Sequence, residues 1–435
     1  MSKSETTVDA AFEALIIGDD GRACRDIPDS ACREEPNNFF THVSSLTLSK
    51  TSDGLIDPKL VLSWLMTSLG APSFVIGLLV PVREAGALLP QMFTAGAIRS
   101  AGVRKYFWAG GAIGQGLSAL GILASALTLS GAVAGWAILG CLAVLALSRS
   151  VCSVAYKDVL GKTVSKSRRG SATGMAGSVS AAFVIIFALL LITDVFERMD
   201  VVLYGLGLAG LFWIAGGLLF TTLQEESGAQ DGGANAFKTA IENLSYLKSD
   251  AQLRLFILVR GLLTVTALAP PLMVAAASAN GTNAFAGLGL LVLASSGASL
   301  LSSMVWGRLA DKSSRKVLIF SAFGGAAALV ATAVAAFTGL LETIWMLPVL
   351  MLALMISYEG VRLGRSTHLV DMADEETRAS YTAISNTIIG FALLAGSVFG
   401  VLAGYLGNVV VLAVMAGFSA VGGILSLGLN EVQAE

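Results

Sequence analysis

Residues 307–316 read Gly-Arg-Leu-Ala-Asp-Lys-Ser-Ser-Arg-Lys, a short charged segment that joins two long apolar stretches, Gly261–Gly307 and Val317–Leu341. The rest of the chain has the same character. Of its 435 residues, 55% are hydrophobic and only 13% are charged, whereas soluble domains carry roughly a quarter charged residues. Such a chain cannot cover its surface in water, so the sequence excludes a soluble enzyme and indicates a polytopic membrane protein.

The apolar stretches can be counted as membrane crossings, each of which needs about 20 residues. Three stretches have about twice that length and must fold back at turn residues near their middles, which are Thr128–Gly131, Ala279–Thr282 and Tyr405–Asn408. With the single-length stretches they give eleven crossings, and the amphipathic segment from Phe39 to about Asp57 gives a twelfth. Residues 60–69 form either the outer end of that first helix or a short periplasmic piece.

Lys and Arg gather in every second connection between spans, and cytoplasmic loops carry this excess. We therefore expect a multi-pass protein of the bacterial cytoplasmic (inner) membrane with both termini in the cytoplasm. The expected divisions are a cytoplasmic N-terminal tail (1–37), an N-terminal six-helix bundle (38–223), a cytoplasmic linker (224–250) and a C-terminal six-helix bundle (251–435).

Several features recur about 210 residues apart. The segment 95–105 ends the second span as 307–316 ends the eighth, Lys50 matches Arg260, and Arg149 matches Glu359. A shared offset indicates two halves in tandem, so the predicted fold is all-α, with twelve transmembrane helices in two pseudo-symmetric six-helix bundles. In such folds the substrate site lies between the halves near the membrane midplane.

The segment 307–316 resembles the cytoplasmic-loop signature of the major facilitator superfamily, Gly-x-x-x-Asp-x-x-Gly-Arg-Lys, and departs from it only at Ser314. In the first-half copy, Arg99 stands where the Asp belongs. The resemblance implies a secondary transporter that works by alternating access, with spans 1, 4, 7 and 10 lining the cavity.

A conformational latch is the role expected for this loop, because Asp311 could sit at the N-terminus of span 5, where the helix dipole favours negative charge. The alternative is an ordinary loop carboxylate. The latch residues are Gly307, Asp311, Arg315 and Lys316.

Ionisable side chains inside spans are costly and are functional-site candidates by default. Lys50 and Arg260 are interpreted as a pair of cations that face the cavity and receive an anionic substrate, an arrangement that resembles the organic-phosphate antiporters of this superfamily. Alternatively, each closes an internal ion pair, Lys50 with Asp53 and Arg260 with Glu359. For Arg149 and Glu359 we weigh a salt bridge between the halves against a purely structural pair.

Arg83 and Glu84 take part either in proton coupling or in a fixed brace. The candidate substrate-binding residues are thus Lys50, Arg149, Arg260, Tyr358 and Arg362. The candidates for proton coupling or gating are Asp53, Arg83, Glu84 and Glu359.

The predicted function is secondary active transport of a small, anionic organic solute, coupled to protons or working by exchange with a counter-substrate. The alternatives are a proton-driven drug or metabolite efflux pump and a membrane scaffold or sensor that does not transport. We expect no enzyme activity and no cofactor or metal, because the two His and four Cys match no zinc or haem spacing. The expected partners are the solute and the lipid bilayer, with no nucleic acid, and the chain is expected to act as a monomer.

Overall fold

The computed structural model describes residues 32–91, 94, 98, 100–193, 195–227, 246–279, 287–373 and 377–433. Within these ranges the regular structure is helical, with no strand. Most of the predicted N-terminal tail and of the predicted linker lies outside the described residues, and the domain limits remain predictions.

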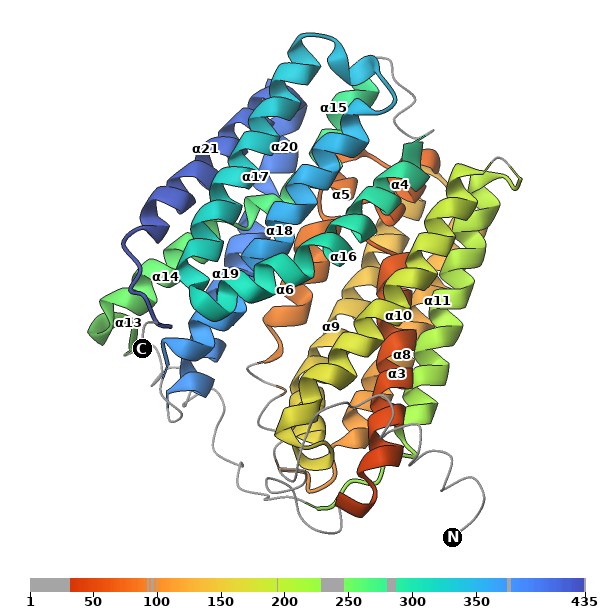
Figure 1. The fold of residues 1–435 in the computed structure, drawn as a ribbon. Coiled ribbons are helices and arrows are strands. Elements are labelled where there is room, and N and C mark those ends of the chain that lie inside the picture. Colours follow the sequence, from red (N-terminus) through yellow and green to blue (C-terminus); the bar gives the residue numbers. More distant parts are fainter. Residues whose placement is uncertain are drawn as a thin grey trace.

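Two groups of helices follow one another along the chain (Figure 1). The N-terminal group consists of α3 (Glu35–Leu55), α4 (Val61–Ser68), α5 (Ser73–Ile76), α6 (Leu79–Leu88), α8 (Lys105–Thr128), α9 (Gly131–Thr163), α10 (Lys166–Ile192) and α11 (Arg198–Phe220). The C-terminal group consists of α13 (Tyr246–Ser249), α14 (Ala251–Leu262), α15 (Val265–Ala279), α16 (Leu288–Lys312), α17 (Ser314–Phe337), the 3₁₀ turn η2 (Leu340–Glu342), α18 (Met346–Asp371), α19 (Arg378–Ala395), α20 (Val398–Leu406) and α21 (Asn408–Ser426).

Nine helical segments in the described part of the chain are long and apolar enough to cross a membrane. We assign three further crossings to α3 with α4, to α5 with α6, and to α16, whose apolar part is Leu288–Ser302. The predicted fold class, all-α with two six-helix halves, is confirmed.

Two of the predicted turns are also confirmed. The chain reverses between α8 and α9 at Gly131 and between α20 and α21 at Gly407, whose φ angles are 62° and 82°. Side chains with a Cβ rarely adopt these left-handed conformations, so glycine at the turns allows a sharp reversal. The third predicted turn, 279–282, falls almost entirely outside the described residues.

The first span is interrupted. α3 ends at Leu55 and α4 begins at Val61, with Pro58 in the connection. Proline lacks a backbone N–H and restricts the residue before it, so it favours a break here. The Asp57 carboxylate accepts hydrogen bonds from the backbone N–H groups of Lys59 (2.8 Å) and Leu60 (3.1 Å) and fixes the turn. α4 is thus a separate short helix beyond the end of α3.

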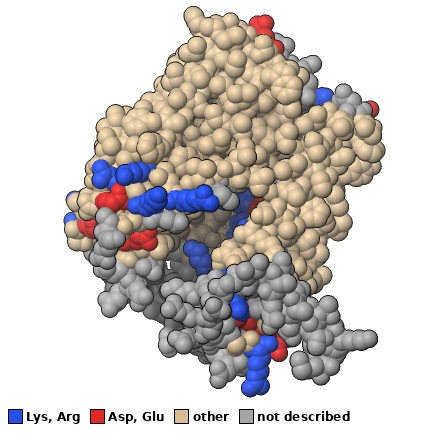
Figure 2. Space-filling view, in the orientation of Figure 1, with Lys and Arg blue, Asp and Glu red and all other residues tan. Residues whose placement is uncertain are grey.

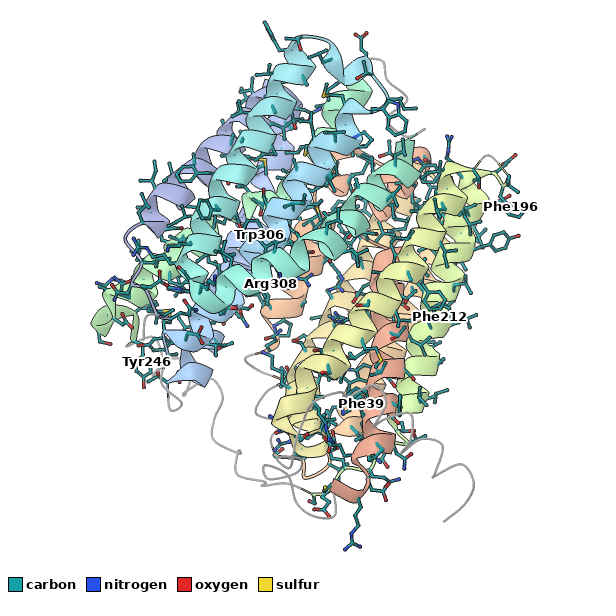
Figure 3. All side chains as sticks on the ribbon, in the orientation of Figure 1. Phe39, Phe196, Phe212, Tyr246, Trp306 and Arg308 are labelled. Carbon is teal, nitrogen blue, oxygen red and sulfur yellow. The ribbon has the colours of Figure 1, made fainter. Side chains whose placement is uncertain are left out.

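The two halves meet near one end of the molecule and spread apart toward the end that carries both termini (Figure 1). We call these the far end and the terminal end. Buried Phe39, in α3, lies at the terminal end, and exposed Phe196, between α10 and α11, lies at the far end (Figure 3). The described helices therefore form a structure that is closed at the far end and divergent at the terminal end.

Small residues allow the halves to approach closely at the far end. A Cβ on Gly77 would lie 3.5 Å from the Cα of Gly400 in the other half. A Cβ on Gly289, at the start of α16, would lie 2.7 Å from Ile192 Cγ1 and 2.8 Å from the carbonyl oxygen of Ala188. Backbones of different halves can touch in this way only where side chains are absent.

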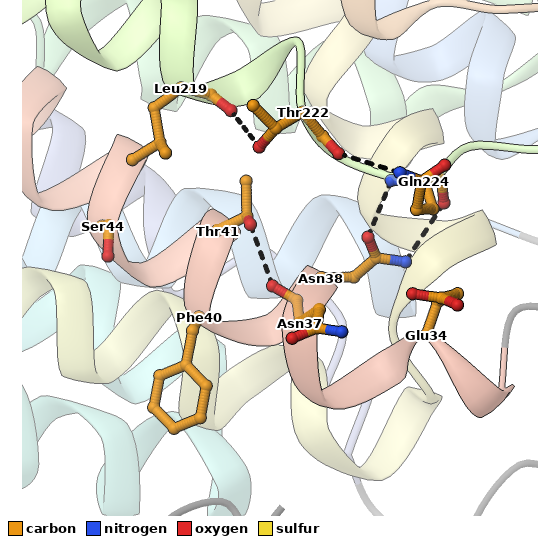
Figure 4. A pocket seen from close by; sticks show the side chains of 9 residues that line it. All are labelled: Glu34, Asn37, Asn38, Phe40, Thr41, Ser44, Leu219, Thr222 and Gln224. Atoms are coloured by element: carbon orange, nitrogen blue, oxygen red, sulfur yellow. Dashed lines mark hydrogen bonds between the residues drawn. The ribbon is translucent and has the colours of Figure 1, made fainter. Parts of the chain in front are cut away.

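A side-chain amide closes the N-terminal half at the terminal end, where α3 begins and α11 ends. Asn38 Nδ2 donates to the carbonyl of Gln224 (3.1 Å), and Asn38 Oδ1 accepts from the N–H of Gln224 (2.9 Å). These two bonds lie at the wall of an open pocket of about 460 Å³ between the two helices (Figure 4). We call this pair the amide clasp.

The C-terminal half has an equivalent clasp between its first and last spans. Gln252 Nε2 donates to the carbonyl of Gly428 (3.3 Å), and Gln252 Oε1 accepts from the N–H of Asn430 (3.0 Å). Each half is therefore tied into a closed bundle by one amide side chain near the start of its first helix. The clasp repeats the internal symmetry that the sequence predicts.

Removal of the buried clasp should destabilise the N-terminal half. Asn38 is 1% exposed, so Asn38→Ala would leave two backbone groups of Gln224 without their partner, which costs about 1–3 kcal/mol. We expect a lower unfolding temperature in detergent for this variant. Gln224→Ala is the matched control, because Gln224 joins the clasp through its backbone and should keep wild-type stability. Equal unfolding temperatures for Asn38→Ala and the wild type would contradict a stabilising role.

Candidate functional site

The polar face of α3 lies inside the N-terminal half. Ser52 Oγ donates to the carbonyl of Ala209 (2.9 Å), and Trp213 Nε1 donates to Ser49 Oγ (3.1 Å). Polar groups in a membrane span have no water to bond with, so they must find partners inside the protein. These bonds attach α3 to α11 and fix which of its faces turns toward the remaining helices.

Asp53, on that face, is the centre of a charge cluster. Its Oδ1 accepts from Arg83 Nη2 (2.8 Å) and its Oδ2 pairs with Arg149 Nη1 (2.8 Å). α6 and α9 supply the two guanidinium groups, so one carboxylate links three spans. The exposed fractions are 26% for Asp53, 14% for Arg83 and 32% for Arg149. The cluster is therefore partly accessible to solvent rather than sealed in the bundle.

Lys50 lies one turn before Asp53 on α3. Its Nζ donates to the carbonyl of Thr173 on α10 (3.0 Å). Its ammonium also interacts electrostatically with Arg149, with Asp53 and with Arg362 of the other half. Two of these three charged neighbours are cations, so the local charge around Lys50 is positive.

α18 brings charges from the C-terminal half toward this cluster. Glu359 Oε2 pairs with Arg362 Nε one turn away, at 3.5 Å, and the Arg362 side chain is 58% exposed. Arg362 lies in the interior of a spanning helix, yet it is open to solvent and interacts with Lys50. It therefore faces an open space between the halves. Figure 2 shows a hollow between the two lobes in which Lys and Arg atoms are visible.

Tyr358 precedes this pair on α18 and contacts the interrupted first span. The ammonium of Lys59 lies 3.5 Å from the centroid of the Tyr358 ring. Glu84, next to Arg83 on α6, interacts electrostatically with both Lys59 and Arg362. The structure thus brings Tyr358 and Glu84 to the same interface between the halves as Lys50 and Arg362.

Arg260 occupies the position in α14 that repeats Lys50, but it has different surroundings. It is 6% exposed, and it donates to Ser385 Oγ (2.7 Å) and Asn386 Oδ1 (2.9 Å) on α19. Asn386 Nδ2 in turn donates to Gln91 Oε1 of the other half (3.3 Å). Arg260 therefore sits behind a polar connection between the halves instead of joining the Asp53 cluster.

The predicted latch segment lies at the terminal end, between α16 and α17. Ser313 Oγ donates to Glu431 Oε2 (2.6 Å), and the N–H of Ser314 donates to Gln433 Oε1 (2.9 Å), so the end of the chain covers the start of α17. Arg315 Nη2 donates to the carbonyl of Leu427 (2.9 Å). Lys316 is exposed, Gly307 lies within α16, and the side chain of Asp311 is outside the described part of the structure.

The partners of the charged residues differ from those that we considered from the sequence. Arg149 pairs with Asp53, and Glu359 pairs with Arg362. Arg260 bonds a hydroxyl and an amide. The roles proposed for these residues in transport are not decided by the geometry and remain predictions.

Sequence reasoning missed Lys59, Gln91 and Asn386. Lys59 carried a usable signal, because it follows Asp57 and Pro58 inside an otherwise apolar region. The sequence gives no signal for Gln91 and Asn386, because an amide side chain in a span can be recognised as part of a contact only once its partner is known. In the described ranges, no group of three or more His, Cys, Asp or Glu side chains is placed to hold a metal ion.

These features define a class of protein: a multi-pass membrane protein of two six-helix halves, with charged groups gathered at the interface between them. Residues 262–434 match the family model described as Major Facilitator Superfamily. The resemblance that we drew from the loop 307–316 is therefore confirmed. A search of curated proteins finds none that matches this chain in sequence.

Solved structures show the same fold over nearly the whole chain. A nucleoside transporter, NupG, is 12% identical, with a TM-score of 0.69 over 91% of this chain and 100% of the other. A POT family transporter in complex with a peptide is 10% identical, with a TM-score of 0.70 over 94% and 99%. The xylose transporter XylE from E. coli is 12% identical, with a TM-score of 0.65 over 92% and 99%. At these identities the likeness establishes the transporter fold alone.

The Asp53 cluster should contribute measurably to stability. Asp53→Asn would leave two guanidinium groups close together without a counter-charge, and each lost charged hydrogen bond costs about 1–3 kcal/mol. In a double-mutant cycle, Asp53→Asn and Arg83→Gln should show a coupling energy of about 0.5–3 kcal/mol, measured from unfolding in detergent. Glu359→Gln should have a smaller effect, because its partner Arg362 is largely exposed. Strict additivity of Asp53→Asn and Arg83→Gln would show that the salt bridge between Asp53 and Arg83 does not stabilise the fold.

Proposed function

We propose that this chain is a secondary active transporter that moves a small organic anion between its two halves by alternating access. The observation that carries the proposal is the pair Lys50 and Arg362. These cations come from opposite halves and lie near enough to repel each other, and Arg362 is open to the space between the halves. An anion bound there would contact both halves at once, as a solute that controls their relative motion must.

The charge balance of the interface supports an anionic solute. Four basic side chains (Lys50, Arg83, Arg149 and Arg362) face three carboxylates (Asp53, Glu84 and Glu359). Arg83 and Arg149 share Asp53, and Arg362 pairs with Glu359, whereas the Lys50 ammonium donates to the backbone carbonyl of Thr173. The count leaves one excess positive charge at the interface. Uncompensated charge inside a membrane protein is costly, and a bound anion would supply the missing counter-charge.

Proton coupling, as opposed to exchange, would run through Asp53. Protonation of this carboxylate would remove the charge that holds Arg83 and Arg149 together. One of the two guanidinium groups would then be available to the solute or to the opposite half. This gives a physical link between proton binding and the geometry of the site, because both act on the same three spans.

We place the protein in the bacterial cytoplasmic membrane as a monomer, with the terminal end in the cytoplasm. The distribution of Lys and Arg among the connections supports this orientation. In that orientation the described structure diverges toward the cytoplasm and is closed toward the periplasm. The solved neighbours carry a nucleoside, a peptide and xylose according to their names, and these different solutes do not narrow the choice for this chain.

Transport of an anion should depend on both cations of the pair. In proteoliposomes screened with phosphorylated and carboxylated metabolites, we expect counterflow of the accepted anion to fall at least about ten-fold in Lys50→Met and in Arg362→Met, because each removes one charged contact. Lys248→Met is the matched control, since Lys248 is exposed on α13 outside the spans. Normal counterflow in both single variants, at wild-type protein levels, would refute the anion site.

Coupling should depend on the charge of Asp53. If transport is proton-driven, Asp53→Asn should abolish accumulation against a gradient when a pH gradient is imposed, while counterflow without a pH gradient continues at a reduced rate. The measurement compares both assays on the same vesicles. Proton-driven accumulation in Asp53→Asn equal to wild type would exclude Asp53 as the coupling group. Wild-type uptake that ignores the pH gradient would show exchange instead of symport.

A further inference from the structure

Lys59 is a buried cation at the interface between the halves, on the far-end side of Lys50 along the first span. It lies in the break of the first span, nine residues beyond Lys50, and it is 5% exposed. Its position is fixed by the Asp57 carboxylate, which accepts a hydrogen bond from the N–H of Lys59 itself. Pro58, which precedes Lys59, accepts a hydrogen bond from Ser63 Oγ at its carbonyl (2.8 Å) and adds to the rigidity of the turn.

The ammonium group of Lys59 is covered by a ring and not by a salt bridge. The Tyr358 ring centroid lies 3.5 Å from Nζ. Asp57 and Glu84 are near enough to interact with the charge, but among the described residues neither forms a salt bridge with Lys59. Asp57 and Glu84 belong to the same half as Lys59 and attract its charge whatever the position of the other half, whereas the aromatic face comes from the other half.

The partner belongs to the opposite half. Lys59 moves with α3 and α4 of the N-terminal half, whereas Tyr358 moves with α18 of the C-terminal half. Alternating access requires the far end to open, and the close contacts of Gly77 with Gly400 and of Gly289 with α10 must then separate. A motion that also separates α18 from the break in the first span would withdraw the Tyr358 ring from the ammonium group of Lys59.

We propose that Lys59 is a second anion-binding residue of the transport path, which receives the solute from the far side and is covered by Tyr358 when that side closes. The proposal rests on the proposed transport of an anion. It adds a site of defined chemistry, a lysine ammonium that binds the carboxylate or phosphate of the solute by charge. The Lys59 ammonium thus contacts the Tyr358 ring in one state of the transporter and the anion in the other.

A side-specific kinetic experiment tests this role. In proteoliposomes of known orientation, Lys59→Met should raise the KM for the anion presented at the far side roughly ten-fold or more, because one charged contact is lost. The KM for the anion presented at the terminal side should stay within about two-fold of wild type, a change worth less than 1 kcal/mol. Lys50→Met is the matched comparison and should raise both values, because Lys50 lies in the central cluster.

A conformational measurement tests the role of the ring without any solute. Spin labels at Thr128 and Thr338, which are exposed at the far ends of α8 and α17, report the opening of this end in a chain whose native cysteines are replaced by serine. Tyr358→Leu removes the ring and should shift the distances toward longer values, whereas Tyr358→Phe keeps the ring and should match wild type. The double variant Lys59→Met with Tyr358→Leu should return to the short distances, because no charge remains to be covered.

The outcomes separate this inference from the proposed function. If the wild-type protein transports no anion, the proposed function fails. If the anion is transported but Lys59→Met leaves the far-side KM unchanged or raises both KM values equally, Lys59 is not a far-side receptor and the central site stands. If Tyr358→Leu and Tyr358→Phe give the same distances, the ring does not cover the charge.

Discussion

The requirement that every charge inside the membrane has a partner within the protein determines most of this structure. Asp53 meets that requirement for Arg83 and Arg149 at once, and so joins α3, α6 and α9 through a single carboxylate. The serine and tryptophan bonds between α3 and α11 hold the helix that carries it. Because these partners all come from the N-terminal half, the cluster can move as one body, and Lys50 and Arg362 are left to respond to what lies between the halves.

Different interactions stabilise the two ends of the molecule. At the terminal end, polar side chains bond to backbone groups in the amide clasps, and Glu431 and Gln433 accept hydrogen bonds from the Ser313 hydroxyl and the Ser314 N–H at the start of α17. These bonds are within each half, so they stiffen the halves without joining them. At the far end, the halves meet through small residues at short distances, which are weak contacts that can separate without breaking strong hydrogen bonds. Motion is thus directed to the interface between the bundles.

Much of the fold followed from the sequence because it depends on local patterns. Apolar length gave the spans, the glycines gave the turns at 131 and 407, and the recurrence of Lys50 at Arg260 gave the two halves. The partners of the charged residues could not be obtained in this way. Arg149 lies 96 positions from Asp53 and matches Glu359 in the repeat, so the repeat did not indicate Asp53, with which Arg149 pairs in this structure. Symmetry also gave no warning that Arg260 would be buried against α19 while Lys50 faces the cluster, since equivalent positions in two halves need not keep the same neighbours.

The break in the first span links these observations. In an uninterrupted helix from α3 through α4, the period of 3.6 residues per turn would fix the direction of residue 59 relative to Lys50 and Asp53. Pro58 ends that regularity, and Asp57 satisfies the N–H groups that the break would otherwise leave unpaired. The turn therefore directs Lys59 toward the opposite half. In a continuous helix the backbone at this position would be fully hydrogen-bonded and could not change the direction of the side chain. The break costs helical hydrogen bonds, but it places Lys59 where the two halves close on each other. The Tyr358 ring offsets the cost of burying the Lys59 charge only in that closed state.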